Sequence, residues 1–157
     1  MIVWDEKKQA WFGKIRMIAV AMLVIAPIIY LGMTYVIKAS GQQGGQIEMM
    51  LYILLAVAII EPAMAIFIER FQISSFKASQ QSQMTPDNVF FTMSVIKFAF
   101  VEMSYLFGLV VYLLSGDRAS MLYFYPIGIA WTFVYWPKKS TYESFIQRIE
   151  SNVPYTG

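Results

Sequence analysis

The chain has 157 residues, of which 58% are apolar and only 14% charged, and its mean hydropathy is +0.54. Soluble domains carry about 25% charged residues, so this composition predicts an integral membrane protein, and the length leaves room for a single membrane domain over residues 1–157. Because the sequence lacks Cys and His and its net charge is only +2, disulfides, thiolate or imidazole metal sites and nucleic-acid binding are excluded, and no cofactor is expected.

Four apolar segments are long enough, or nearly so, to cross a hydrocarbon layer of about 30 Å, which takes about 20 helical residues. They are 17–37, 49–68, 89–114 and 119–136. The first carries no charge, the second is interrupted by Glu61 and Pro62, and the third contains Lys97 and Glu102. This pattern predicts an all-α fold, an antiparallel bundle of four transmembrane helices.

The first segment follows several basic residues, as a signal peptide would. Its apolar run of 21 residues, Met17 to Ile37, exceeds the usual hydrophobic region of about 7 to 15 residues, and no clear cleavage site follows. We therefore expect the segment to be retained. Pro27 and Pro126 should bend or loosen the first and fourth helices.

The distribution of basic residues predicts the orientation. The N-terminal segment, the second connection and the tail together carry Lys7, Lys8, Lys14, Arg16, Arg70, Lys77, Lys138, Lys139 and Arg148. The other two connections contain only Lys38 and Arg118. By the positive-inside rule both termini face the cytoplasm, and we expect the inner membrane of a bacterium.

The connection over 71–88 is rich in Ser and Gln, and Thr85-Pro86-Asp87 resembles a helix start. It is either a solvated link or a docking surface. Both chain ends are predicted to form short amphipathic helices. In the tail Ser140 and Glu143 fit a capping box that precedes an apolar stripe of Tyr142, Phe145, Ile146 and Ile149. These helices would lie on the membrane surface, although a partner groove uses the same spacing.

Two carboxylates lie within apolar segments, where an ionised group costs at least about 3 kcal/mol, so each must be paired, protonated or functional. Glu61 and Glu102 are expected at similar depth on adjacent helices. Lys97 is about 140° from Glu102 around a helix, so it would snorkel or reach Glu61 instead. The possible tyrosine donors to a carboxylate are Tyr30, Tyr35, Tyr52, Tyr105 and Tyr112.

Small residues mark where helices should approach closely. Ala58 and Ala65 share a face with Glu61, and Ser104 and Gly108 form a ridge on the third span. Pro62 lacks an N–H and so frees a carbonyl near the acid.

Residues 99–114, with Glu102, Tyr105, Gly108, Leu109 and Val110, resemble the carboxylate-bearing helix of the proteolipid c subunits of rotary ATP synthases. That resemblance implies a reversible proton or sodium site at Glu102. The second span lacks the family's Gly-x-Gly-x-Gly run and the loop lacks its Arg-Gln-Pro, so a working rotor subunit is not expected.

The sequence predicts a helix-packing, non-catalytic subunit of a larger membrane complex or homo-oligomer. The alternative is a proton- or sodium-handling protein that uses Glu102, with Glu61 as a second acid. An enzyme is not expected, because no clustered acidic metal motif or phosphate-binding loop is present. The expected partners are the lipid bilayer and other membrane subunits or copies of the same chain.

Overall fold

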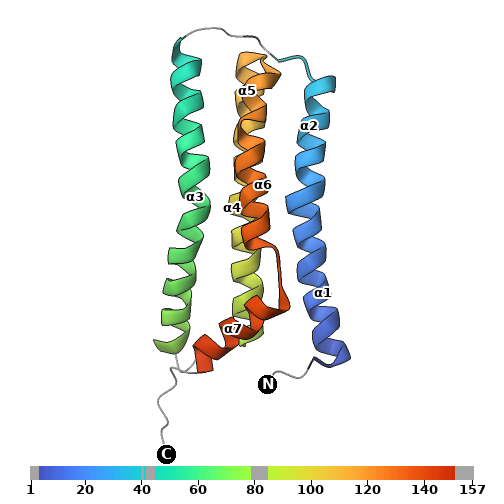
Figure 1. Ribbon diagram of the computed structural model, residues 1–157, viewed down its shortest axis with the longest axis vertical. Helices are drawn as coiled ribbons and strands as arrows, with labels where there is room; N and C mark the ends of the chain where they lie inside the picture. Colours follow the sequence, from blue (N-terminus) through green and yellow to red (C-terminus); the bar gives the residue numbers. More distant parts are fainter. Residues whose placement is uncertain (1–3, 40, 42–44, 79–84, 151–157) are drawn as a thin grey trace, which may run out of the picture.

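The computed structural model describes residues 4–39, 41, 45–78 and 85–150. Every regular element within these ranges is a helix, and no strand occurs among them. The long helices run side by side, and the described ends of the chain lie together at one end of the bundle (Figure 1). The prediction of an all-α fold is confirmed.

The first helix is continuous from Glu6 to Val36, as α1 (Glu6–Val20), a wide π-helical turn (Ala21–Ile25) and α2 (Ala26–Val36). Asp5 caps its start by accepting a hydrogen bond from the Lys8 N–H at 2.8 Å. The wide turn directly precedes Pro27, which has no N–H to bond the carbonyl four residues back. The predicted loosening of this helix therefore occurs one turn before the proline.

The prediction of a separate N-terminal interfacial helix is wrong. The basic N-terminal segment forms the first turns of the spanning helix, with no break before Met17. Phe12, Ile15 and Ala19 are buried along one side of it. Core packing therefore continues through the segment that its charges marked as interfacial.

The next two helices, α3 (Gly45–Ala78) and α4 (Pro86–Ser115), form an antiparallel pair. Thr85 caps α4 by accepting from the Asn88 N–H, and Pro86 occupies the first turn, as the sequence predicted. The sequence predicted a connection over 71–88. The structure makes it shorter, because α3 continues through the Ser- and Gln-containing stretch to Ala78. Its use as a link or docking surface falls largely on residues 79–84, outside the described residues.

The chain then returns along α4 as two helices, α5 (Arg118–Leu122) and α6 (Phe124–Tyr135), which are separated by a turn at Tyr123 (Figure 1). The break precedes Pro126, which cannot donate to the Leu122 carbonyl. Three helices are long and apolar enough to cross a membrane, at Glu6–Val36, Gln46–Ser74 and Pro86–Ser115. The fourth predicted segment, 119–136, does not form one helix of that length.

The core is organised around α4, which contacts the first helix, α3, α5, α6 and α7. Its buried side chains include Phe98, Val101 and Tyr105. In contrast, many large apolar side chains of the other helices point outward, among them Tyr52, Ile60, Met64, Phe67, Phe71 and Phe133. An apolar exterior around a packed interior suits lipid rather than water as the surrounding medium.

The last helix, α7 (Lys139–Glu150), lies across the end of the bundle (Figure 1). Its apolar stripe, Tyr142, Phe145, Ile146 and Ile149, is buried within the main core cluster. Phe90 lies edge-on to both Tyr142 and Phe145, with ring centroids 5.1 and 5.3 Å apart.

The prediction that this amphipathic stripe lies on the membrane surface is therefore wrong, because the protein's own side chains cover it. The predicted capping box is not formed either. The helix begins at Lys139, one residue before Ser140, and the Glu143 carboxylate accepts a hydrogen bond from the Trp4 indole at 2.7 Å. Glu143 therefore joins the two ends of the chain.

Candidate functional site: the intramembrane acids

Glu102 is paired inside the bundle. The Tyr30 hydroxyl, on α2, donates to its Oε1 at 2.5 Å. Of the tyrosines that the sequence offered as donors, the structure places Tyr30 at this carboxyl. A carboxyl with such a donor is partly compensated for its removal from water, and the bond links α2 to α4.

Glu61 is different, because its Oε2 atom is buried and has no hydrogen-bond partner among the described residues. The side chain lines a groove of about 260 Å³ whose other walls are the α4 side chains Ile96, Ala99, Phe100 and Met103. Ala99 and Met103 are exposed, so the groove opens to the outside of the bundle. Glu61 is thus a half-buried carboxyl set in an apolar, outward-facing groove.

The two acids are not partners in the structure. Glu102 faces α2, whereas the α4 wall of the groove at Glu61 is formed by residues 96, 99, 100 and 103. On a helix with 100° per residue, position 102 lies about 110° from the middle of that wall. The predicted two-acid site is therefore two separate carboxyls on different sides of α4.

Lys97 pairs with Glu69, and not with Glu61, which was one of the two alternatives that the sequence left open for it. Glu69 is 8% exposed and also receives a hydrogen bond from Arg148, whose Nη2 lies 2.6 Å from Oε1. The cation of Lys97 lies 5.6 Å from the centre of the Tyr135 ring. Glu69 of α3 is thus shared by two cations, Lys97 of α4 and Arg148 of α7, with the Tyr135 ring of α6 beside Lys97.

Sequence reasoning missed this cluster because Glu69 stands next to Arg70 at the expected end of a span. The pair directly follows the predicted span 49–68, so it was taken to lie at the membrane surface, where a charged residue needs no buried partner. The available signal was the helical spacing, since Glu69 lies four residues after Ala65 and eight after Glu61 and so shares their side of α3. A residue on the packing side of a helix needs a partner when it is charged.

Tyr105 is buried and its side chain contacts α6. Its hydroxyl lies 3.3 Å from the Thr132 hydroxyl, and its ring packs edge-on against Tyr125. A Cβ added at Gly128 would lie only 2.4 Å from the ring. The structure thus places Tyr105 in the packing between α4 and α6.

The four predicted packing residues all lie between helices. Ala58 and Ala65 on α3 are fully buried, and so is Ser104 on α4. A Cβ at Gly108 would lie 2.9 Å from the Met121 carbonyl oxygen, so the chain approaches this glycine too closely for a side chain. Small residues therefore occupy points of close helix approach.

The carbonyl freed by Pro62 is that of Ala58, four residues earlier, and it has a partner. The Ser104 hydroxyl donates to it from α4 at 3.4 Å. The Tyr135 hydroxyl donates to the carbonyl of Pro62 itself at 2.6 Å. The proline thus provides two points at which neighbouring helices bond to the backbone of α3.

Within the described residues no group of three or more acidic side chains is arranged to hold a metal ion. No protein-family model, curated protein or solved structure matches this chain. The resemblance of residues 99–114 to proteolipid c subunits therefore stays a prediction. What the site can do chemically must be argued from the two carboxyls and their surroundings.

Proposed function

We propose that this protein is a non-catalytic, helix-packing subunit of a membrane assembly, made with other membrane proteins or with copies of itself. The observation that carries the proposal is the unpartnered carboxyl oxygen of Glu61 in an outward-facing apolar groove. Lipid chains offer no donor to this oxygen, whereas a polar side chain on an approaching transmembrane helix does. The groove between α3 and α4 is then the face at which that helix packs.

The exposed surface of α3 supports the same assignment. Within the described residues, α3 makes extensive contacts with α4 and α6 alone. Tyr52, Ile60, Met64, Phe67 and Phe71 all have more than half of their surface exposed. A helix with one apolar face free along its length has room for a lateral neighbour beside the Glu61 groove.

We further propose four membrane crossings, the fourth formed by α5 and α6 together, with both termini in the cytoplasm of a bacterial inner membrane. The argument is that α5, α6 and the segment that leads to α7 return the chain to the end at which α1 begins (Figure 1). That end carries most of the basic residues beside the spans, including Lys14, Arg16, Lys138 and Lys139. The positive-inside rule assigns such an end to the cytoplasm.

The decisive experiment measures the mass and the companions of the protein after gentle extraction in mild detergent. We expect an assembly larger than one chain. In that assembly Glu61→Leu should lower the association constant by about threefold to thirtyfold, the value of one hydrogen bond between membrane helices. Glu61→Gln, which keeps a polar group there, should lose much less.

The matched control is Glu48→Leu, which makes the same change at an exposed position in the first turn of the same helix. It should leave the assembly intact. A wild-type protein that is monomeric and without companions would contradict the proposal. So would an equal loss of assembly in Glu61→Leu and Glu48→Leu.

The second candidate is proton or sodium handling. Glu61 favours it, because this half-buried carboxyl lines a groove that opens to the outside of the bundle and has one oxygen without a hydrogen-bond partner among the described residues. Glu102, the acid in the c-like stretch, already has Tyr30 as a donor. Dicyclohexylcarbodiimide reacts with protonated carboxyls in lipid, and peptide mass spectrometry locates the label. Labelling at neutral pH of Glu61 or Glu102 in a closed homo-oligomeric ring would favour ion handling over the accessory role.

A further inference from the structure

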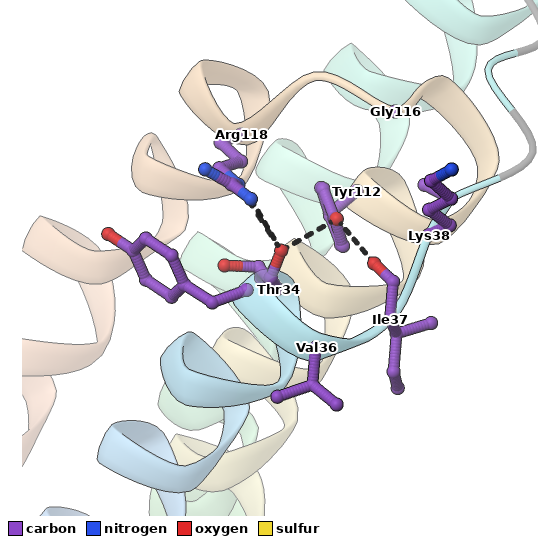
Figure 2. A pocket seen from close by; sticks show the side chains of 9 residues that line it. Thr34, Val36, Ile37, Lys38, Tyr112, Gly116 and Arg118 are labelled. Atoms are coloured by element: carbon purple, nitrogen blue, oxygen red, sulfur yellow. Dashed lines mark hydrogen bonds between the residues drawn. The ribbon is translucent and has the colours of Figure 1, made fainter.

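A pocket of about 380 Å³ lies where α2 ends, beside the start of α5. This is the end of the bundle opposite the described chain ends (Figure 1). The close view shows Arg118 and Tyr112 directed at the carbonyl of Thr34, with Lys38 on the segment that leaves α2 (Figure 2). The pocket is separate from both intramembrane acids.

Arg118 is held in place by a backbone carbonyl, and no carboxylate of the described residues pairs with it. Its Nε and Nη2 atoms donate to the Thr34 carbonyl at 3.2 and 2.9 Å, and its guanidinium carbon lies 4.5 Å from the centre of the Tyr35 ring. A guanidinium has five N–H donors, so three are left for a ligand. A planar cation already held in one orientation is well suited to bind a phosphate through two parallel bonds.

The other charges around the pocket add to this positive site. Lys38 is a second lining cation, and no Asp or Glu lines the pocket. The nearby Asp117 carboxylate accepts from the N–H groups of Ala119 and Ser120 and from the Ser120 hydroxyl. It is therefore engaged by α5 itself.

The carbonyls at the end of α2 would repel an anion if they were free, because the C-terminus of a helix carries partial negative charge. Here the Tyr112 hydroxyl lies within hydrogen-bond distance of two of them, 2.8 Å from Thr34 O and 2.7 Å from Ile37 O. Arg118 binds the first of these as well. Arg118 and Tyr112 thus offset part of the negative end of α2, and the charged side chains that line the pocket, Arg118 and Lys38, are both cations.

The remaining lining is apolar and exposed. Val36 is 86% exposed and Tyr35 70%, and Ile37 follows them at the end of a membrane-spanning helix. Tyrosine at such a boundary is typical of the level of the lipid headgroups. The pocket therefore offers cations and an apolar surface side by side, which matches a ligand with a phosphate and hydrocarbon chains.

We propose that this pocket binds the phosphate of an anionic phospholipid, with Arg118 and Lys38 as its ligands and Val36 and Ile37 against the first part of the acyl chains. Arg118 supplies the oriented pair of donors. Lys38 supplies a second charge that no described hydrogen bond or ion pair engages.

The test titrates the full-length protein in mild detergent with dioleoylphosphatidylglycerol and measures the fraction that carries lipid by native mass spectrometry. Lys38→Gln should weaken binding by about fivefold, since one basic side chain near an anionic lipid contributes on the order of 1 kcal/mol. Arg118→Lys keeps the charge but loses the planar pair of donors, so it should weaken binding as well. Arg118 also bonds the end of α2, so its replacement affects folding as well as binding. If the Arg118→Lys protein does not fold, the result for Lys38→Gln decides the test.

The matched control is Lys138→Gln, which removes one exposed positive charge at the opposite end of the bundle. It should bind the lipid as the wild type does. Dioleoylglycerol, which lacks the phosphate, should bind poorly. The proposal is overturned if Lys38→Gln and Lys138→Gln bind equally, or if dioleoylglycerol binds as tightly. Displacement of the lipid by inorganic phosphate at constant ionic strength would overturn the lipid assignment and indicate a soluble phosphate ligand.

Discussion

The contact between Gly128 on α6 and Tyr105 on α4 leaves no room for a methyl group. A Cβ at position 128 would lie 2.4, 2.6 and 2.8 Å from three carbons of the tyrosine ring. Carbon atoms pack best at about 3.5–4.0 Å, so the ring or the helix would have to move by roughly 1 Å. The ring is held by Tyr125, 5.2 Å away between centroids, and by the Thr132 hydroxyl.

From this geometry we expect Gly128→Ala to destabilise the protein. Overpacking a fixed core typically costs about 1–3 kcal/mol, while alanine gains about 1 kcal/mol over glycine inside a helix. The net loss is then about 1 kcal/mol and at most about 2. For a chain of this size it should lower the melting temperature in mild detergent by about 2–8 °C.

The control is Gly32→Ala on α2, where a Cβ would meet nothing within 4 Å. The same substitution should there leave the melting temperature unchanged or raise it. Replacing Tyr105 by leucine removes the outer ring carbons, so in that background Gly128→Ala should cost little. The reasoning is refuted if Gly128→Ala is as stable as Gly32→Ala, or if the leucine background does not change its cost.

Three further predictions concern the polar contacts. Lys97→Met removes one of the two cations that pair with the buried Glu69 carboxylate and should cost about 2 kcal/mol in thermal unfolding, whereas Arg148→Gln, at a half-exposed partner, should cost less. Tyr30→Phe should lose about 1–3 kcal/mol by removing the donor to the acid on α4, and the exposed Tyr52→Phe should lose almost nothing. Hydrogen bonds from the Ser120 hydroxyl and two backbone N–H groups hold the pKa of Asp117 below its usual value, so its contribution to stability is present at neutral pH and lost in acid. The difference in melting temperature between wild type and Asp117→Asn should therefore shrink as the pH falls below about 4, and a constant difference would contradict this sign.

The sequence was sufficient to predict the long helices, but not the residues at which each one begins and ends. Apolar length located the three spanning helices, and Thr85 with Pro86 located the start of α4, because both signals are local. The predicted start of the first spanning helix was wrong, because the charged residues before Met17 were taken to lie outside it. The helix in fact continues through them, since its backbone hydrogen bonds continue and Phe12 and Ile15 pack against the core. Residue type alone does not distinguish a cytoplasmic extension of a spanning helix from a helix lying on the membrane.

The partners of the buried charges were beyond the sequence for a different reason. Helical spacing correctly separated Lys97 from Glu102, since both lie on α4 and the angle between them is fixed. Which neighbouring helix each one faces depends on how the helices pack, and that requires the whole bundle. Glu69 and Tyr30 come from two different helices, and no local pattern connects them to their partners.

The hydrogen bond between Trp4 and Glu143 joins residues 139 positions apart, and it has a consequence for biosynthesis. A ribosome makes α7 after every helix that it packs against, so the ring of Phe90 has its partners Tyr142 and Phe145 only once residues 139–150 have been synthesised. A chain that stops before residue 139 therefore leaves this aromatic surface uncovered. Packing of α7 over the end of the bundle thus follows the synthesis of all the helices before it.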